Sequence, residues 1–178
     1  PYADSNLQFA DNGNIKIAVW QRQSKNLAFE PGQTATDDDL NAMMNASEIC
    51  AAVYDEASDS WTTKQLTENG MADMAPVVAA NGKKAVAVWR RVASTTTQNV
   101  AAMEFDTRND LLYSVWDGET WSEEKTIYNG TSGAIKGLSA AMDEEGNTII
   151  TYAIDSSSYV GKVEMAAFAA EQENQKLD

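Results

Sequence analysis

The sequence predicts an all-β fold, a partial β-propeller of about three four-stranded antiparallel blades of which the third is incomplete. Three observations predict it: a repeated segment, short apolar runs of strand length, and glycine-centred turns between those runs. The repeat shows in its aromatic strand ends, because Trp20 and Trp89 are 69 residues apart and Trp89 and Tyr152 are 63 apart. A unit of this length has room for four short strands, the content of one propeller blade.

The first half of each repeat is predicted to be a β-hairpin. Segments 6–20 and 75–89 align without a gap, and each has an Asn-Gly pair before the tryptophan that ends it. Asn-Gly is a dipeptide that hairpin turns with positive φ prefer. Segment 138–152 is a third copy, with Gly146 in its turn and a tyrosine at its end. We therefore expect a strand, a tight turn and a second strand in each copy.

The second half of each repeat supplies further predicted strands. Segments 48–55 and 110–117 are third strands, and Trp61 and Trp121 mark the starts of the fourth strands. A third copy begins at 162–169, but its outer strand is missing from the sequence. The predicted boundaries within one domain, residues 1–178, are about 4–71 for the first blade, about 72–133 for the second and about 134–178 for the third.

Three blades are too few to close a ring, since known propellers have at least about four. We therefore expect the chain to be a piece of a larger propeller, whose remaining blades come from a missing segment or from another chain. The start at Pro1 favours a trimmed or processed product. Alone, the chain is expected to aggregate or to bind a partner fragment or copies of itself, because its outer blades leave apolar faces in water.

The composition excludes several classes of function. Of 178 residues 43% are apolar, and 27 acidic against 13 basic residues give a net charge of −14. A surface this negative repels phosphate backbones and anionic lipid, so we expect no nucleic-acid partner and no membrane insertion. The absence of histidine excludes His-based acid–base chemistry and most zinc sites. The single cysteine, Cys50, excludes an internal disulfide and is predicted to be a buried structural thiol.

Two long connections stand between predicted second and third strands, at 22–47 and 91–109, whereas the corresponding connection at 155–161 is short. In a propeller these connections share one face. Loops longer than about 12–15 residues are usually functional or disordered, and both interpretations stay open here. Within the first connection, Asp37 is predicted to cap a short helix that has Met44 on its apolar face.

Polar and aromatic side chains gather on this long-loop face and make it the predicted ligand-binding surface. An exposed aromatic offers stacking area, and arginine offers a planar fork for carboxylate or hydroxyl groups. The candidate ligand-binding residues are Phe29, Arg90, Arg91, Phe105, Asp110 and Asp155, with Arg22 and Glu48 nearby. A carboxylate pair among them would suit glycoside hydrolysis, but solvated strand ends are the simpler interpretation and no catalytic residue is assigned.

No cofactor is expected, with calcium as the one alternative. The acidic turns at 11–14 and 143–147 offer the oxygens that hard cations prefer, but they lack the length of an EF-hand loop. We interpret them as ordinary hairpin turns and assign no metal site. The tryptophans recur at fixed blade positions, so we expect them to fill the space between blades rather than to stack on sugars.

Segment Ser114-Val-Trp-Asp-Gly-Glu-Thr-Trp121 resembles the Asp-box of sialidase-like propellers, whose pattern is Ser-x-Asp-x-Gly-x-Thr-Trp. Asp117 sits one place late in it and abuts the glycine. In the first blade only Ser60 and Trp61 match, with Glu56 at the Asp position. Such boxes (also called BNR repeats) lie in the turn between the third and fourth strands of blades in many secreted bacterial proteins, so the resemblance implies an architecture.

The combined observations predict a secreted or cell-surface, non-enzymatic binding module whose ligand is a glycan or an extracellular protein. The alternative is a fragment of a sialidase-like glycoside hydrolase whose catalytic residues lie mostly on missing blades. Only four arginines are present and the Arg-Ile-Pro signature of that family is absent, which favours the binding module. A structural spacer is the third possibility. The extracellular prediction rests on the single cysteine, the acidity and the resemblance.

Overall fold

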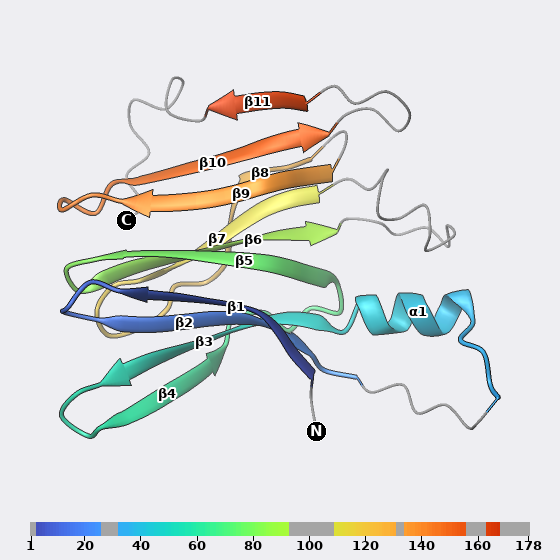
Figure 1. Ribbon diagram of the computed structural model, residues 1–178, viewed down its shortest axis with the longest axis horizontal. Coiled ribbons are helices and arrows are strands. Elements are labelled where there is room, and N and C mark those ends of the chain that lie inside the picture. The colour runs from blue at the N-terminus through green and yellow to red at the C-terminus, as the bar shows by residue number, and fades with distance from the viewer. Residues whose placement is uncertain (1–2, 26–31, 93–108, 131–133, 156–162, 168–178) are drawn as a thin grey trace.

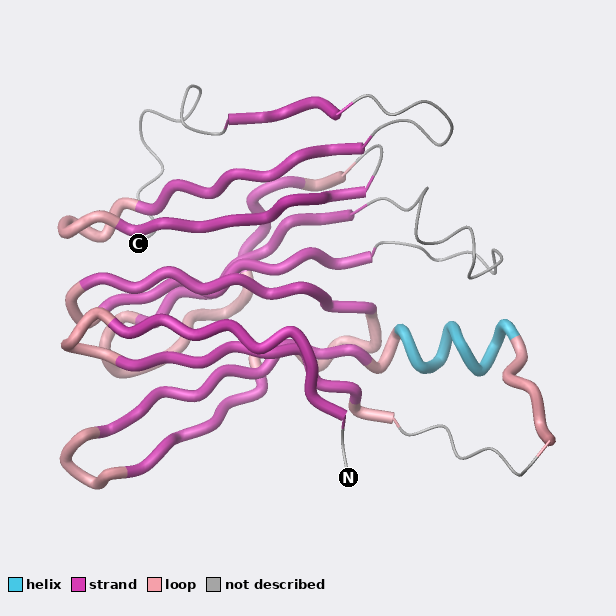
Figure 2. Tube along the Cα trace, in the orientation of Figure 1, coloured by secondary structure: helices cyan, strands magenta, loops and turns pink. Residues whose placement is uncertain are grey.

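The computed structural model confirms the all-β prediction. It describes residues 3–25, 32–92, 109–130, 134–155 and 163–167. These residues form three antiparallel sheets side by side and one short helix (Figures 1 and 2). The arrangement matches a partial propeller with two complete blades and one partial blade.

We call the three sheets blade 1, blade 2 and blade 3, and within each the strands follow chain order. Blade 1 contains β1 (Ala3–Asp11), β2 (Lys16–Gln23), β3 (Ser47–Asp55) and β4 (Ser60–Gln65). Blade 2 contains β5 (Ala72–Asn81), β6 (Lys84–Val92), β7 (Asn109–Trp116) and β8 (Lys125–Tyr128). Blade 3 contains β9 (Ala134–Met142), β10 (Thr148–Asp155) and β11 (Val163–Ala167), and helix α1 (Asp37–Met44) lies between β2 and β3.

The repeat is preserved down to a backbone irregularity in the first strand of each blade. The register shifts in β1, β5 and β9 at matching places. Within each shift one residue has a positive φ: Asn6 at 52°, Ala75 at 51° and Gly137 at 60°. Glycine and asparagine adopt this region readily, whereas alanine does so at a cost in energy. These three residues anchor a position-by-position comparison of the blades.

Strand β6 is buried on both sides and forms the centre of the molecule. Ala85, Ala87 and Trp89 pack against blade 1, whereas Val86 and Val88 pack against blade 3. The split follows from the pleat, because successive side chains of a strand point to opposite faces. We call the side of a blade that faces the preceding blade its back face and the opposite side its front face.

The prediction that tryptophans fill the space between blades is confirmed for Trp89 and Trp121, which are buried between blades 1 and 2. For Trp61 it stays a prediction: Trp61 occupies the position of Trp121 in blade 1 and is 46% exposed in the described chain, against 5% for Trp121. Trp61 packs on Tyr54, and Trp121 packs on Trp116, in each case across the strand pair. The difference in burial arises because Trp61 lies on the back face of blade 1, where the described chain places no preceding blade.

The turn that carries the Asp-box resemblance is stabilised by its aspartate. One carboxylate oxygen of Asp117 accepts hydrogen bonds from the backbone N–H groups of Glu119 and Thr120, both at 2.8 Å. These bonds lower the pKa of Asp117. In blade 1 the same contact is made by Asp55, which accepts from the N–H of Ala57 at 2.9 Å. The sequence pattern had placed Glu56 there, one residue too late.

Two local predictions have different outcomes. The N-cap of α1 is Thr36 rather than Asp37: Thr36 Oγ1 accepts from the N–H of Asp39, and the Asp39 carboxylate accepts from the N–H of Thr36. This reciprocal capping box satisfies two backbone groups at once. Cys50 is fully buried as predicted, and burial raises the pKa of its thiol to about 11. No helix in the described ranges is long and apolar enough to cross a membrane.

The contrast between the two equivalent tryptophans gives the first prediction. Trp121→Ala should lower the free energy of unfolding by about 3–5 kcal/mol, the usual effect of deleting a buried aromatic. Trp61→Ala, its matched control in blade 1, should lower it by only about 1 kcal/mol because much of that ring is already in water. Urea unfolding at low protein concentration measures both, and equal losses would contradict the assignment of Trp121 to the interface between blades.

Candidate functional site

The predicted site residues that the structure describes belong to one end of the blades. We call this the long-loop end: it is where β2, β6 and β10 end and where β3, β7 and β11 begin, on the right of Figure 1 beside α1. The opposite, short-turn end carries the hairpin turns around Gly13, Gly82, Gly118 and Gly146, which all have positive φ.

The structure brings three of the six predicted residues together. Arg90 and Arg91 lie near the end of β6. Asp110 belongs to the neighbouring strand β7, where it pairs with Arg91 in the register. Asp155 ends β10 at the same end, but its side chain lies outside the described part of the structure. Phe29 and Phe105 lie outside the described residues altogether.

Arg91 is the centre of a buried ion cluster. Its Nε and Nη2 donate to the two oxygens of Asp73 at 2.8 and 3.0 Å. Its Nη1 and Nη2 donate to the two oxygens of Glu124 at 2.8 and 2.6 Å. Burial opposes the charge of Arg91, but the hydrogen bonds that it donates to both carboxylates outweigh this effect and hold the guanidinium pKa above its usual range. The carboxylates of Asp73 and Glu124 thus occupy the guanidinium of Arg91, which the sequence analysis had predicted to bind a ligand.

Asp73 has no exposed surface, and four donors compensate its buried charge. Besides the two bonds from Arg91, its Oδ1 accepts from the indole Nε1 of Trp89 at 3.0 Å and its Oδ2 from the side-chain amide of Asn69 at 2.9 Å. A buried carboxylate is costly unless it is paired and hydrogen-bonded, and both conditions hold here. Trp89 therefore contributes a polar bond as well as its apolar surface.

Glu48, at the start of β3, is a second buried carboxyl close to this cluster. Thr67 Oγ1 donates to Glu48 Oε2 at 2.6 Å and accepts from the N–H of Ile49 at 2.9 Å. Burial raises the pKa of Glu48, the bond from Thr67 opposes the rise, and the charge of Asp73 adds to it. The Glu48 carboxyl therefore ionises less readily in the folded protein than in the unfolded chain.

Arg90 and the start of β7 connect blade 2 to blade 3. Arg90 Nη1 donates to the backbone carbonyl of Ile135 at 3.2 Å, and the N–H of Ile135 donates to Asn109 Oδ1 at 2.8 Å. Asp110 Oδ1 accepts from the N–H of Gly130 at 3.0 Å. Gly130 approaches closely enough that an added Cβ would stand 2.0 Å from the carbonyl oxygen of Asn109. These contacts hold the long-loop end of the two blades together.

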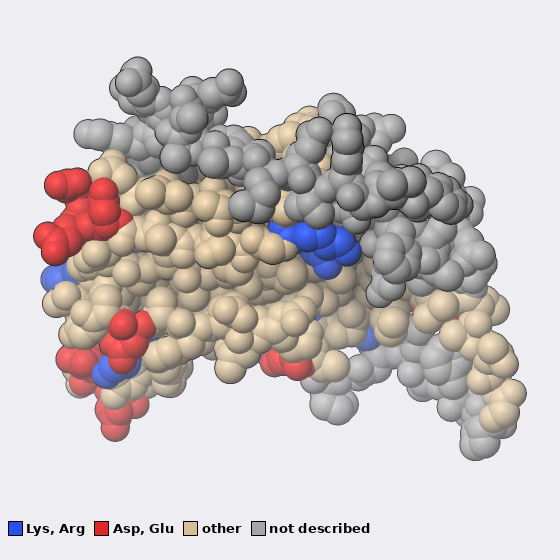
Figure 3. All heavy atoms as spheres, turned by 45° about the horizontal axis from the view of Figure 1, so that its top comes forward, with Lys and Arg blue, Asp and Glu red and all other residues tan. Residues whose placement is uncertain are grey.

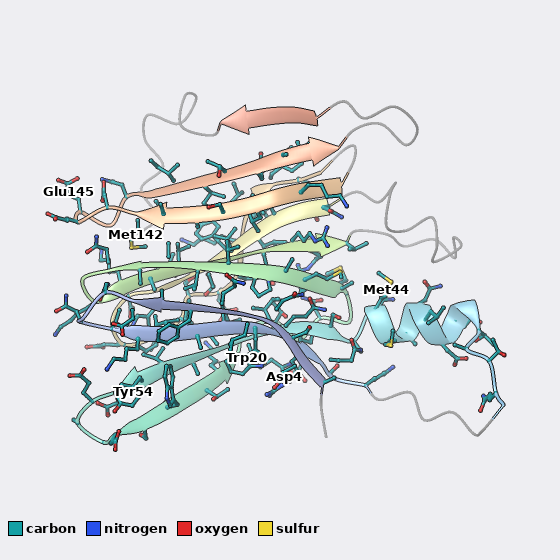
Figure 4. The ribbon with its side chains drawn as sticks, in the orientation of Figure 1. Asp4, Trp20, Met44, Tyr54, Met142 and Glu145 are labelled. Carbon is teal, nitrogen blue, oxygen red and sulfur yellow. The ribbon has the colours of Figure 1, made fainter. Side chains whose placement is uncertain are left out.

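Blade 1 contains the same ion pair in exposed form. Arg22 Nε and Nη2 donate to the two oxygens of Asp4 at 2.9 and 3.0 Å, with the guanidinium over the ring of Trp20 (Figure 4 labels Asp4 and Trp20). Extending the alignment of 6–20 with 75–89 by two residues at each end pairs Asp4 with Asp73 and Arg22 with Arg91. The repeated Asp and Arg positions in this longer alignment could have identified Asp73 from the sequence, but the sequence analysis did not use them.

Blade 3 replaces the pair with apolar residues. Ile135 and Ile154 occupy the corresponding positions and lie opposite each other in β9 and β10. In the strand register Lys64 of blade 1 matches Lys125 of blade 2, so the third member of the cluster, Glu124, has no acidic counterpart in blade 1. The repeat therefore contained no signal for Glu124.

The two ends of the molecule differ in charge. Exposed acidic residues gather at the short-turn end, as Figure 3 shows on one face. They are Asp11, Asp55, Glu56, Asp59, Asp117, Glu119, Asp143, Glu144 and Glu145. Asp143 illustrates their bonding: its Oδ1 accepts from the N–H groups of Glu145 and Asn147 at 3.0 and 2.8 Å. Within the described residues no group of three or more Cys, Asp or Glu is placed to hold a metal ion.

The chemistry available at the long-loop end follows from this geometry. Asp73 and Glu48 are buried, so neither can touch a sugar. The carboxylate of Asp110 accepts a hydrogen bond from the backbone N–H of Gly130, in the segment that follows β8. Glycoside hydrolysis needs two carboxyl groups that flank an accessible bond. Asp73, Glu48 and Asp110 instead stabilise the scaffold, and Arg90 is a partly buried basic residue beside them.

The repeated ion pair yields a matched prediction. Arg91→Met should lower the free energy of unfolding by about 3–5 kcal/mol, because it leaves the buried carboxylate of Asp73 without its ion-pair partner. Arg22→Met breaks the same two bonds at an exposed site and should cost only about 0.2–1 kcal/mol. Urea denaturation measures both losses. A small effect of Arg91→Met would mean that the cluster adds little to the interface between blades.

Glu48 gives a prediction on pH. Because the folded protein raises the pKa of this carboxyl, the folded state binds more protons than the unfolded state, and the stability that Glu48 contributes falls as pH rises above its unfolded pKa. Glu48→Gln keeps an acceptor for Thr67 and removes the buried charge. The variant should therefore gain stability over wild type at pH 7 and lose that gain near pH 4. Denaturation curves at both pH values measure it, and a gain independent of pH would contradict the titration of Glu48.

No family model matches the sequence, and comparison with curated proteins finds no match. Among solved structures, Trypanosoma rangeli sialidase in complex with 2,3-difluorosialic acid (a covalent intermediate) is similar, with a TM-score of 0.50 and 11% identity over 93% of this chain and 30% of that chain. The same sialidase in complex with sialic acid has a TM-score of 0.45 at 11% identity and the same coverage. Zg3597, a family 117 glycoside hydrolase from the marine bacterium Zobellia galactanivorans, has a TM-score of 0.45 and 10% identity over 93% of this chain and 55% of that chain.

The chain therefore spans less than a third of the sialidase and about half of the bacterial hydrolase. At this level of identity the likeness concerns the fold, which it identifies as a sialidase-like β-propeller.

Proposed function

We propose that this chain is part of a secreted or cell-surface propeller that binds a glycan at the long-loop end without hydrolysing it. The observation that carries the proposal is that the carboxylates at the centre of that end are bonded within the scaffold. Asp73 and Glu124 are bound to Arg91, and Glu48 is bonded to Thr67, so these groups serve the scaffold. A rigid scaffold that supports loops is the usual construction of a binding site.

Charge favours the long-loop end over the short-turn end for a glycan that carries a carboxylate. The short-turn end presents a row of exposed acidic side chains, which would repel such a ligand. At the long-loop end Arg90 is partly buried and anchored through Nη1 to the carbonyl of Ile135, which limits the entropy lost on binding. Phe105 belongs to the adjoining connection and is proposed to add a stacking surface.

The test starts from an array of defined glycans and continues with calorimetric titration of the strongest ligand. Arg90→Ala combined with Phe105→Ala should weaken binding by about tenfold or more, equivalent to about 1–3 kcal/mol. Lys83→Ala is the matched control, because Lys83 stands in the turn at the opposite end of the β5–β6 hairpin. Circular dichroism of each variant checks that the fold is retained, since Arg90 also links blades 2 and 3.

The remaining outcomes contradict the proposal. An array without a ligand would exclude the glycan, and a ligand whose affinity the double variant leaves unchanged would exclude this surface. Steady release of aryl groups from a panel of aryl glycosides would identify a hydrolase instead. The same panel assayed with Glu48→Gln would then test whether a described carboxyl takes part.

A further inference from the structure

Helix α1 belongs to the connection between two strands of blade 1, yet it packs on blade 2. Met44, the last residue of α1, packs on the buried pair Ala72 and Val92 of blade 2, and Met74 packs on the same pair. We call these four residues the docking cluster. It lies at the long-loop end, where Figure 1 shows α1 beside the strand ends. Both partners are inside the described chain, so the contact is independent of any further blades.

The docking cluster is specific to blade 2. In the strand register Val92 pairs with Ala72, and Met74 pairs with Arg90. The positions of Met74 and Val92 are held by polar residues in the other two sheets: Ser5 and Gln23 in blade 1, and Lys136 and Asp155 in blade 3. Of the three described sheets, the one that receives α1 is thus the one with apolar residues at both positions. The pairing of these residues with Met44 explains the difference.

Helix α1 needs this packing to stay folded. It has eight residues, and helices so short are marginal in water without tertiary contacts. Asn41, one turn before Met44, has a buried Oδ1 with no hydrogen-bond partner among the described residues, which costs free energy. A polar bond holds the end of the helix, where the side-chain amide of Gln23 donates to the carbonyl of Met43. The apolar contact of Met44 is therefore required to keep α1 on blade 2.

The sulfur atoms of this contact are open to chemical change. Oxidation of a methionine thioether gives a sulfoxide, which converts an apolar side chain into a polar one. Met44 and Met74 are both partly exposed, so a small oxidant can reach them. Cys50, the single cysteine, is fully buried and burial raises the pKa of its thiol to about 11, so its reactive thiolate scarcely forms. An oxidant at the long-loop end therefore meets methionine sulfur.

We propose that Met44 and Met74 are oxidation sites that control the docking of α1 on blade 2. Hydrogen peroxide transfers one oxygen atom to the thioether sulfur: the O–O bond breaks, an S–O bond forms and the second oxygen leaves as water. The sulfur loses two electrons and the peroxide gains them. The sulfoxide oxygen then faces Ala72 and Val92, which offer no side-chain donor, so the docked position is disfavoured and α1 is released. Methionine sulfoxide reductases reverse the change.

Release of α1 alters the long-loop end next to Arg90. Met74 and Arg90 are paired in the strand register, so their side chains share one face of blade 2. An effect of oxidation on glycan binding therefore rests on the proposed function. The oxidation and the release of α1 need no ligand and are measured on the chain alone, so their failure is distinct from a failure of the glycan contact.

Hydrogen exchange resolved by mass spectrometry tests the proposal on the 178-residue chain before and after treatment with hydrogen peroxide. Peptide mapping locates each sulfoxide. Oxidation of Met44 or Met74 should speed the exchange of hydrogen-bonded amides of α1, such as those of Leu40 and Asn45, by about tenfold or more, because a polar group without a partner shifts the docking equilibrium by that factor. The amides of β6 should keep their protection, because release of α1 leaves the core between the blades intact.

Variants separate the two sulfurs from the rest of the chain. Met44→Leu combined with Met74→Leu keeps apolar packing and removes both sulfurs, so peroxide should leave α1 protected. Met142→Leu is the matched control: it makes the same change in β9, and Figure 4 labels Met142 at the end opposite Met44. That variant should respond to peroxide like wild type. Met44→Gln places a polar group at the contact and should speed exchange in α1 without oxidant, whereas reductase treatment of oxidised wild type should restore protection.

Four results would overturn the proposal. Sulfoxides at Met44 and Met74 without faster exchange in α1 would show that docking does not depend on these side chains. Faster exchange in the oxidised double leucine variant would assign the effect to another sulfur, such as that of the exposed Met71. Loss of protection in β6 together with α1 would indicate general unfolding. A peroxide dose that oxidises Met71 fully and leaves Met44 and Met74 intact would show that the two sulfurs are inaccessible.

Discussion

The burial of β6 on both of its sides is the constraint on which the rest of the structure depends. Its residues Ala85 to Trp89 have no exposed surface, although the strand belongs to an antiparallel sheet. Antiparallel strands commonly alternate between apolar and polar residues because one face meets water. Here both faces are apolar because blade 2 lies between two other sheets. Within the described residues, blades 1 and 3 each have one face covered by blade 2, and the exposed aromatics of blade 1 lie on its other face.

The ion cluster at Arg91 shows how polar residues enter a surface that is otherwise apolar. Burying Asp73 demands full compensation, which Arg91, Trp89 and Asn69 supply through four hydrogen bonds. Blade 3 packs on blade 2 with Ile135 and Ile154 at the matching positions. A hydrophobic pair can often replace a buried ion pair without loss of stability, so the cluster is one of two solutions to the same packing requirement. Its presence at the predicted site accordingly reflects architecture.

The sequence predicts the blades well because the repeat is local: hairpins, Asn-Gly turns and strand-ending aromatics are all set by residues close together in the chain. It fails where a residue depends on a distant partner. From the sequence alone, the guanidinium of Arg91 is predicted to be accessible to a ligand. In the structure it binds Glu124, which is 33 residues away in the chain. Trp61 looks like Trp121 in sequence, but the neighbouring blade decides whether it is buried. Errors of one residue, as with Thr36 and Asp55, arise where adjacent side chains could make the same cap or turn.

Equivalent positions that hold different residues separate the common scaffold from the specialised part of the molecule. Gln21 in blade 1 corresponds to Arg90 in blade 2, and both point from a front face to the next blade. Gln21 Oε1 accepts from the N–H of Ala75 at 3.3 Å, whereas Arg90 donates to the carbonyl of Ile135 at 3.2 Å. A neutral amide is enough to link the blades at this position. The arginine in blade 2 adds a positive charge at a position where blade 1 has a neutral amide, and the proposed glycan contact would use this charge.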